Sequence, residues 1–166
     1  MNKKRLVNKD KVRRLKKKLS EANPVKPRIS RKNRKRTWCE QAIQDLLTDM
    51  KIPYEIEIAI PFKLSWKHYD VGLEEYPILI EVDGDYWHGN KEAMNEEQKI
   101  NWMQMKNKQN DLLKNWVAKS KGYTLIRIWE SEVKDDLPAV RAKIRKVIRE
   151  VKSLKEEEKN TQLTKG

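Results

Sequence analysis

Two acidic residues lie close together in the segment Ile80–Gly84, whose sequence is IEVDG. If this segment is a β-strand, side chains alternate along it, so Glu81 and Asp83 share one face. Two carboxylates leaving a buried strand are costly unless a cation or a partner neutralises them. Asp70 can add a third carboxylate from a neighbouring strand, and oxygen ligands of this kind suit Mg²⁺ or Mn²⁺. Alternatively, these acids pair with surface lysines or form a turn at Asp83-Gly84.

A histidine follows these acids at a short distance. His88 is one of two histidines in the chain and lies five residues after Asp83, in a predicted loop that can fold back over the acids. An imidazole can transfer protons near neutral pH. Tyr86 and Trp87 can pack the loop down or stack against nucleic acid. Alternatively, His88 is an ordinary loop histidine and Trp87 is a core aromatic.

Glu40 is a further acidic candidate, on a helix predicted over 37–50. It is in register with Ile43 and Leu47 at the edge of the apolar face, so its carboxylate points toward the sheet. It could bind a metal through water or orient a nucleophile. Thr37 lies three residues earlier, which makes simple helix capping an equally good interpretation.

The elements that position these residues follow from the periodicity of the apolar residues. A helical period predicts the helix over 37–50. Alternation predicts one strand over Tyr54–Phe62, and a second strand is expected near 66–73. The apolar run before Glu81 predicts a third, central strand over Tyr76–Asp83.

The second half of the chain predicts two helices around one strand. Residues 92–120 are helix-rich, Tyr123–Trp129 is predicted as the fourth strand, and 136–158 as the final helix. The residues of 92–120 predicted to be buried are Trp102, Met103, Leu112, Leu113, Trp116 and Val117. The result is an α/β fold of order α-β-β-β-α-β-α. Its mixed four-stranded sheet is flanked by helices, with the long helix crossing over to the last strand.

The positive charge is concentrated in a basic N-terminal arm. The 166-residue chain has a formal net charge of +13, and residues 1–36 hold 17 Lys and Arg against two acids, a net of +15. A thin apolar stripe predicts a basic helix over 8–22 within this arm. Such an arm favours nucleic acid as partner, since binding releases condensed counterions; a solubility tail or a nuclear or nucleolar address is the alternative. The DNA-binding candidates are Arg13, Arg14, Lys16, Lys17, Lys18, Arg31, Lys32, Arg34, Lys35 and Arg36.

Composition excludes several other classes of protein. No apolar run approaches the roughly 20 residues of a membrane span, and the basic N-terminus does not resemble a secretory signal. The single Cys39 excludes an intrachain disulfide and a multi-cysteine zinc site. We therefore expect an intracellular, DNA-associated protein with an arm over 1–36, a core domain over 37–158 and a polar tail over 159–166.

Several of these motifs resemble a known family. Asp70 followed by Glu81-Val82-Asp83 resembles the D…(D/E)-X-K signature of the PD-(D/E)XK nuclease superfamily, with Asp83 in the usual lysine position. The segment Val82–Gly89, VDGDYWHG, is similar to the signature loop of very-short-patch repair endonucleases and related homing endonucleases. The segment Asn107–Glu130, which includes Asp111, looks like the closing helix and strand of that family. The resemblance covers roughly residues 31–135.

The resemblance implies a restriction-endonuclease-like core and metal-assisted hydrolysis of DNA phosphodiester bonds. It implies that Asp70 and the main-chain carbonyl of Val82 hold Mg²⁺ or Mn²⁺. It also implies that His88 is the acid–base residue and that Glu40, matching the helical acid, binds a metal-coordinated water.

Four positions depart from the repair enzymes. Glu81 stands where they have an apolar residue, although it matches the second acid of the wider superfamily. Asp83 stands where they have another histidine. Asp85 and Asn90 stand where cysteines would be expected, so we expect no structural zinc. A homing or phage-type nuclease fits at least as well as a mismatch-repair enzyme.

Two functions remain after this reading. The first is a magnesium-dependent endonuclease that nicks or cuts DNA. The second is a non-catalytic nucleic-acid-binding or assembly protein on a nuclease-like fold, in which the basic arm makes the interaction. The two differ in whether the DNA strand is altered and whether a divalent metal is needed.

Overall fold

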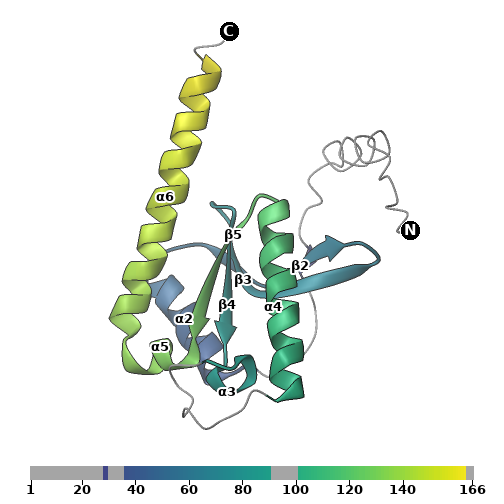
Figure 1. The fold of residues 1–166 in the computed structure, drawn as a ribbon. Coiled ribbons are helices and arrows are strands. Elements are labelled where there is room, and N and C mark those ends of the chain that lie inside the picture. The colour runs from purple at the N-terminus through teal and green to yellow at the C-terminus, as the bar shows by residue number, and fades with distance from the viewer. Residues whose placement is uncertain (1–27, 30–35, 91–100, 164–166) are drawn as a thin grey trace, which may run out of the picture.

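The computed structural model describes residues 28–29, 36–90 and 101–163, which form a mixed sheet between helices (Figure 1). The sheet order is β1-β2-β3-β4-β5, with antiparallel neighbours up to β4 and a parallel β4–β5 pair. The strands are β1 (Arg28–Ile29), β2 (Tyr54–Phe62), β3 (Ser65–Leu73), β4 (Ile78–Asp83) and β5 (Thr124–Trp129). The helices are α2 (Trp38–Asp49), α3 (Asp85–His88), α4 (Trp102–Ser120), α5 (Glu130–Asp135) and α6 (Leu137–Leu163). The predicted α/β fold is confirmed.

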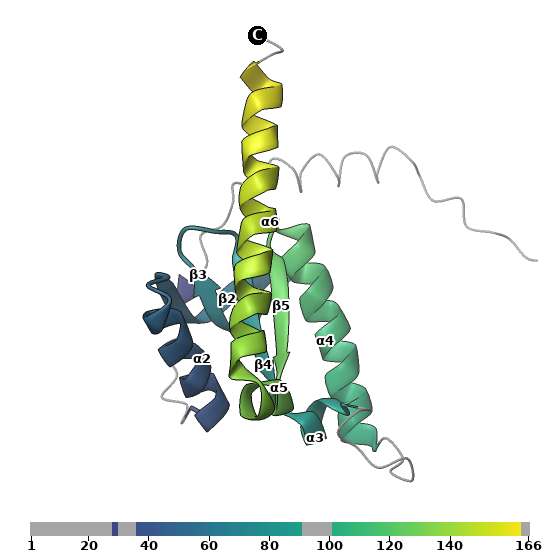
Figure 2. The same ribbon diagram turned by 90° about the vertical axis from the view of Figure 1, so that its left-hand side faces the viewer.

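Helices cover both faces of the sheet (Figures 1 and 2). On one face α2, α5 and α6 pack a core that contains Ile43, Ile80 and Ile144. On the other face α4 packs through Val117 against Leu79 of β4. Because β4 is buried from both sides, its polar residues Glu81 and Asp83 are enclosed between the sheet and α4. None of the helices in the described part of the chain has the length and apolar character of a membrane span.

Halfway along the β2–β3 hairpin, the side chains switch from one face of the sheet to the other. Tyr69 packs with the α4 cluster, whereas Val71 packs with the α2–α6 cluster, although residues two apart normally share a face of a strand. The change occurs at Asp70 and at Glu57, which lies opposite it on β2 and has a left-handed φ of 53°. The predicted single face of the Tyr54–Phe62 strand is therefore divided between the two cores.

Most of the predicted apolar face of α4 is exposed. Trp102, Leu112 and Trp116 lie on the surface, and Met103 is also exposed. Only the C-terminal part of α4 packs on the sheet, through Leu113, Val117 and Ala118. The N-terminal part of the helix contacts α3 instead. The prediction that this whole apolar set is buried was therefore wrong, because periodicity does not show how far a helix overlaps the sheet.

Three features lie outside the predicted element order. Arg28–Ile29 of the predicted basic arm forms β1 and pairs with β2, which adds a fifth strand. Helix α5 begins directly after β5, and its Glu132 carboxylate accepts a 2.7 Å hydrogen bond from the Trp129 N–H. Helix α6 extends to Leu163, into the segment predicted as a polar tail.

Candidate active site

His88 is placed by one turn of helix, where the sequence predicted a loop folding back over the acids. Helix α3 follows β4 immediately, and the His88 N–H donates to the Gly84 carbonyl at 3.1 Å. Gly89 ends the turn in the left-handed region, at φ 64°, which glycine adopts without strain. The end of β4 and the imidazole are therefore linked by a single tight connection.

Helix α4 supports this turn by capping its free carbonyl groups. The Gln104 side chain donates to the Tyr86 carbonyl at 2.6 Å, and the Asn107 side chain donates to the Trp87 carbonyl at 2.8 Å. The last carbonyl groups of a helix have no partner within it and need such donors. Tyr86 and Trp87 are themselves 55% and 54% exposed, so Trp87 is not a core aromatic.

Asp85 and Asn90 hold the other side of the turn. The Asn90 amide donates to Asp85 Oδ1 at 2.7 Å, and the Ser131 N–H donates to Asp85 Oδ2 at 2.9 Å. The Ser131 hydroxyl also donates to Asp85 Oδ1, at 3.0 Å. Asp85 and Asn90 are thus joined by a hydrogen bond, and the two hydrogen bonds from Ser131 tie α3 to α5.

Asp83, His88 and Asp111 form a compact group between β4 and α4. Each offers one ligand atom, and these three atoms lie within 4.8 Å of one another. His88 Nδ1 is 2.7 Å from Asp111 Oδ2 and 3.6 Å from Asp83 Oδ1. Among the residues that the structure describes, this is the one group of three or more acidic, histidine or cysteine side chains close enough to hold a metal ion.

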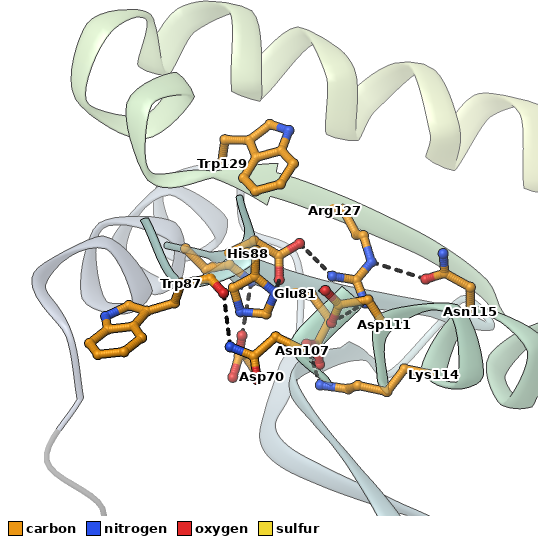
Figure 3. Close-up of polar contacts among 12 residues, drawn as sticks. Asp70, Glu81, Trp87, His88, Asn107, Asp111, Lys114, Asn115, Arg127 and Trp129 are labelled. Atoms are coloured by element: carbon orange, nitrogen blue, oxygen red, sulfur yellow. Dashed lines mark hydrogen bonds and ion pairs between the residues drawn. The ribbon is translucent and has the colours of Figure 1, made fainter. Parts of the chain in front are cut away.

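Two basic side chains neutralise the acids of this site (Figure 3). Arg127 Nη1 donates to Asp83 Oδ2 at 2.5 Å, and Lys114 Nζ donates to Glu81 Oε2. Glu81 is buried, and its Oε1 has no hydrogen-bond partner. Burial raises the pKa of Glu81 to about 8, although the Lys114 charge opposes this shift. The second oxygen of Glu81 is therefore available to a ligand or a proton.

Asp70 and Glu40 are the remaining residues that the sequence predicts for the site. Asp70 accepts a 2.8 Å hydrogen bond from the Val82 N–H, so its carboxylate bridges the point where β3 separates from β4. Glu40 is buried at the start of α2, where it completes a capping box with Thr37. The compact group shares only Asp83 with the metal-ligand set predicted from the sequence, which was Asp70, Glu81, Val82 and Asp83.

The predicted DNA-binding residues are almost all outside the described residues. Arg36 is the exception, and its guanidinium donates to the Gln44 side chain at 3.1 Å. The predicted helix over 8–22 also falls outside the described part. The candidates outside it are Arg13, Arg14, Lys16, Lys17, Lys18, Arg31, Lys32, Arg34 and Lys35.

Comparison with known proteins finds similarity to solved structures only. No protein-family model and no curated protein match the sequence. A solved structure, the catalytic domain of the homing endonuclease I-Bth0305I, is similar to this chain with a TM-score of 0.45 and 22% sequence identity. The similarity covers 67% of this chain and 93% of that domain.

The charges in the compact group determine its protonation. The hydrogen bond to Asp111 raises the pKa of His88, and the nearby Asp83 charge adds to this effect. Burial alone would raise the pKa of Asp111, but the hydrogen bond from His88 and the Arg127 charge outweigh it and lower the pKa. His88 therefore stays protonated to a higher pH than a free histidine, while Asp111 stays ionised.

We expect Asp111→Asn to lower the pKa of His88, because the hydrogen-bonded negative charge beside Nδ1 is lost. In the wild type, stabilisation from the His88–Asp111 ion pair is fully present below the ordinary histidine pKa. It disappears as the pH rises through the raised one. An NMR titration of the two histidines measures this directly, with His68 on β3 as the control signal. An unchanged His88 titration in the variant would contradict the ion pair.

Proposed function

We propose that this chain is a metal-dependent DNA endonuclease that hydrolyses phosphodiester bonds, as a nicking or double-strand-cutting enzyme of homing or phage type. The observation that carries the proposal is the compact Asp83–His88–Asp111 group, with the unpaired oxygen of buried Glu81 nearby. Such a concentration of acidic groups around one histidine, at the end of a central strand, combines a cation site with a proton-transfer residue. The sequence resemblance to PD-(D/E)XK nucleases supports the same reaction.

The donor set fits a hard divalent cation such as Mg²⁺ or Mn²⁺. Asp83 and Asp111 would hold it, with Asp70, Glu81 and the main-chain carbonyl of Val82 as the further ligands that the sequence predicts. When bound, such an ion neutralises phosphate charge and lowers the pKa of a coordinated water. A positive ion beside Glu81 also favours its ionised form, so binding should release a proton there.

His88 is assigned the proton-transfer role rather than a ligand role. Asp111 engages Nδ1 and fixes the ring, leaving Nε2 to give a proton to the leaving oxygen of the DNA strand. Asp111 is thus the orienting group of an acid–base pair. Glu40, at the start of α2, keeps its predicted water-binding role within this proposal.

The surroundings of the site favour a nucleic-acid substrate. The exposed rings of Tyr86 and Trp87 lie in an edge-on contact, with centroids 5.2 Å apart, on the turn that carries His88. Exposed aromatic rings can stack on unpaired bases. The basic arm adds sequence-independent attraction to phosphates. The substrate would therefore be held through both its backbone and its bases.

Incubation with supercoiled plasmid tests the proposal. We expect relaxed or linear product with Mg²⁺ or Mn²⁺ and none with a chelator present, because the proposed reaction needs the ion to neutralise phosphate charge and to lower the pKa of the attacking water. Mismatched duplex, branched DNA and RNA in parallel reactions define the substrate class. Intact plasmid under all metal conditions, with a folded protein, would reject the enzyme.

A non-catalytic nucleic-acid-binding protein is the second candidate, and one observation favours it. Lys114 already pairs with Glu81, and Arg127 already pairs with Asp83 and Asp111, so each of these acids has a positive partner within the chain without a metal. Such a protein should bind DNA equally well in chelator and leave the strands intact. The plasmid reaction and a binding titration, each with and without chelator, separate the two candidates.

A further inference from the structure

Arg127 lies at the centre of the polar contacts in this site. It is on β5, and in the parallel β4–β5 ladder it is the partner of Glu81. Its side chain extends toward α4, where Asp111 and Asn115 are within reach (Figure 3). One side chain therefore joins two strands of the sheet to the helix that covers them.

Arg127 binds one oxygen of each of the two carboxylates, Asp83 and Asp111. Nη1 donates to Asp83 Oδ2 at 2.5 Å, and Nη2 donates to Asp111 Oδ1 at 3.2 Å. The other oxygen of each carboxylate faces His88 Nδ1, at 3.6 Å for Asp83 Oδ1 and 2.7 Å for Asp111 Oδ2. Nε is engaged as well, since it donates to Asn115 Oδ1 at 3.0 Å. Three acceptors, from Asp83, Asp111 and Asn115, therefore hold the planar guanidinium group of Arg127.

We propose that Arg127 is a positioning residue that orients both carboxylates for cation binding. By holding one oxygen of Asp83 and one of Asp111, it turns their second oxygens toward a common point beside His88. This inference rests on the proposed metal site and assigns a role to a residue that the sequence did not single out. Two carboxylates that converge without such a donor would repel each other and rotate apart.

A simple counter-ion role makes the opposite prediction. If Arg127 only supplied positive charge, Lys at this position would serve as well, and removing the charge would strengthen the binding of another cation. A lysine cannot bridge the two carboxylates, because it presents a point charge rather than a planar fork. The response to Lys therefore distinguishes orientation from charge.

The test is a calorimetric titration of the full chain with Mn²⁺, comparing wild type with Arg127→Lys and Arg127→Gln. We expect each substitution to weaken Mn²⁺ binding by about 10–100-fold, the usual effect of losing a group that orients metal ligands. The matched control is Arg141→Lys, because Arg141 pairs with Asp49 on the surface at 3.7 Å. Thermal melting confirms that each variant is folded at the titration temperature. If Arg127→Lys does not fold, Asn115→Ala takes its place, since it removes only the acceptor of Nε and should weaken binding several-fold.

The outcomes separate the two proposals. Wild-type binding of Mn²⁺ with unchanged binding by Arg127→Lys, or tighter binding by Arg127→Gln, overturns the positioning role alone. Unchanged binding by Asn115→Ala, where that variant carries the test, does the same. A folded wild-type chain that takes up no Mn²⁺ overturns the proposed metal site and the positioning role with it.

Discussion

Asp83→Asn is expected to lower the rate of Mg²⁺-dependent DNA cleavage by about 10²–10⁴-fold, since a metal ligand contributes several kcal/mol to the transition state. Asp83 is 1% exposed, ends the central strand and contacts both Arg127 and His88. The substitution keeps the shape of the side chain and removes its charge. Initial rates of plasmid nicking at saturating Mg²⁺, together with a Mn²⁺ titration, measure the two consequences. Both should fall together.

Asp85→Asn is the matched control, with the same chemical change two residues further along. Asp85 Oδ1 accepts hydrogen bonds from the side chains of Asn90 and Ser131, and Oδ2 accepts one from the Ser131 N–H. All three lie away from the compact group. Loss of the Asp85 charge should therefore reduce the free energy of unfolding by about 1.5–3 kcal/mol, the range for a hydrogen bond to a charged group. Mn²⁺ binding should be retained at temperatures where the variant is folded. Equal losses of Mn²⁺ affinity in the two variants would contradict the placement of the site.

Strand alternation correctly predicted that Glu81 and Asp83 share one face of β4. A period of two placed Glu81 and Asp83 on one face of β4, and both are buried on the side that α4 covers. The local pattern succeeded here because both residues lie within one strand.

The basic half of the site depends on contacts that are distant in sequence. Arg127 faces Glu81 only because β5 enters the sheet parallel to β4 in one particular register. Lys114 and Asp111 reach the site only because the C-terminal part of α4 overlaps the sheet. A chain with 38 Lys and Arg offers many other candidates of the same types. Only the family resemblance points to Asp111, and no local pattern singles out Arg127.

Short or irregular elements were also beyond a periodicity argument. The two-residue β1 and the single turn of α3 contain too few residues to show any period. The left-handed backbone at Glu57 reverses the facing of a strand that alternates regularly in sequence. In each case tertiary contacts, rather than the intrinsic preference of the residues, determine the conformation.

Removing residues 1–27 is expected to weaken DNA binding by about 10²-fold or more at low salt, because 11 Lys and Arg and the counterions that they would release are lost. The deletion keeps Arg28–Ile29, whose pairing with β2 is part of the sheet, so the core should still melt cooperatively. Fluorescence anisotropy between roughly 50 and 200 mM salt should show a shallower dependence of log K on log salt.

The full-length control for this deletion replaces the basic cluster Arg13, Arg14, Lys16, Lys17 and Lys18 with Gln, which removes charge and keeps length. Much of the affinity loss should remain in this control, because the interaction depends on phosphate neutralisation rather than on one specific contact. If neither variant changes the salt dependence, the arm does not bind DNA. If the deletion abolishes cooperative melting, the arm is instead part of the folded core.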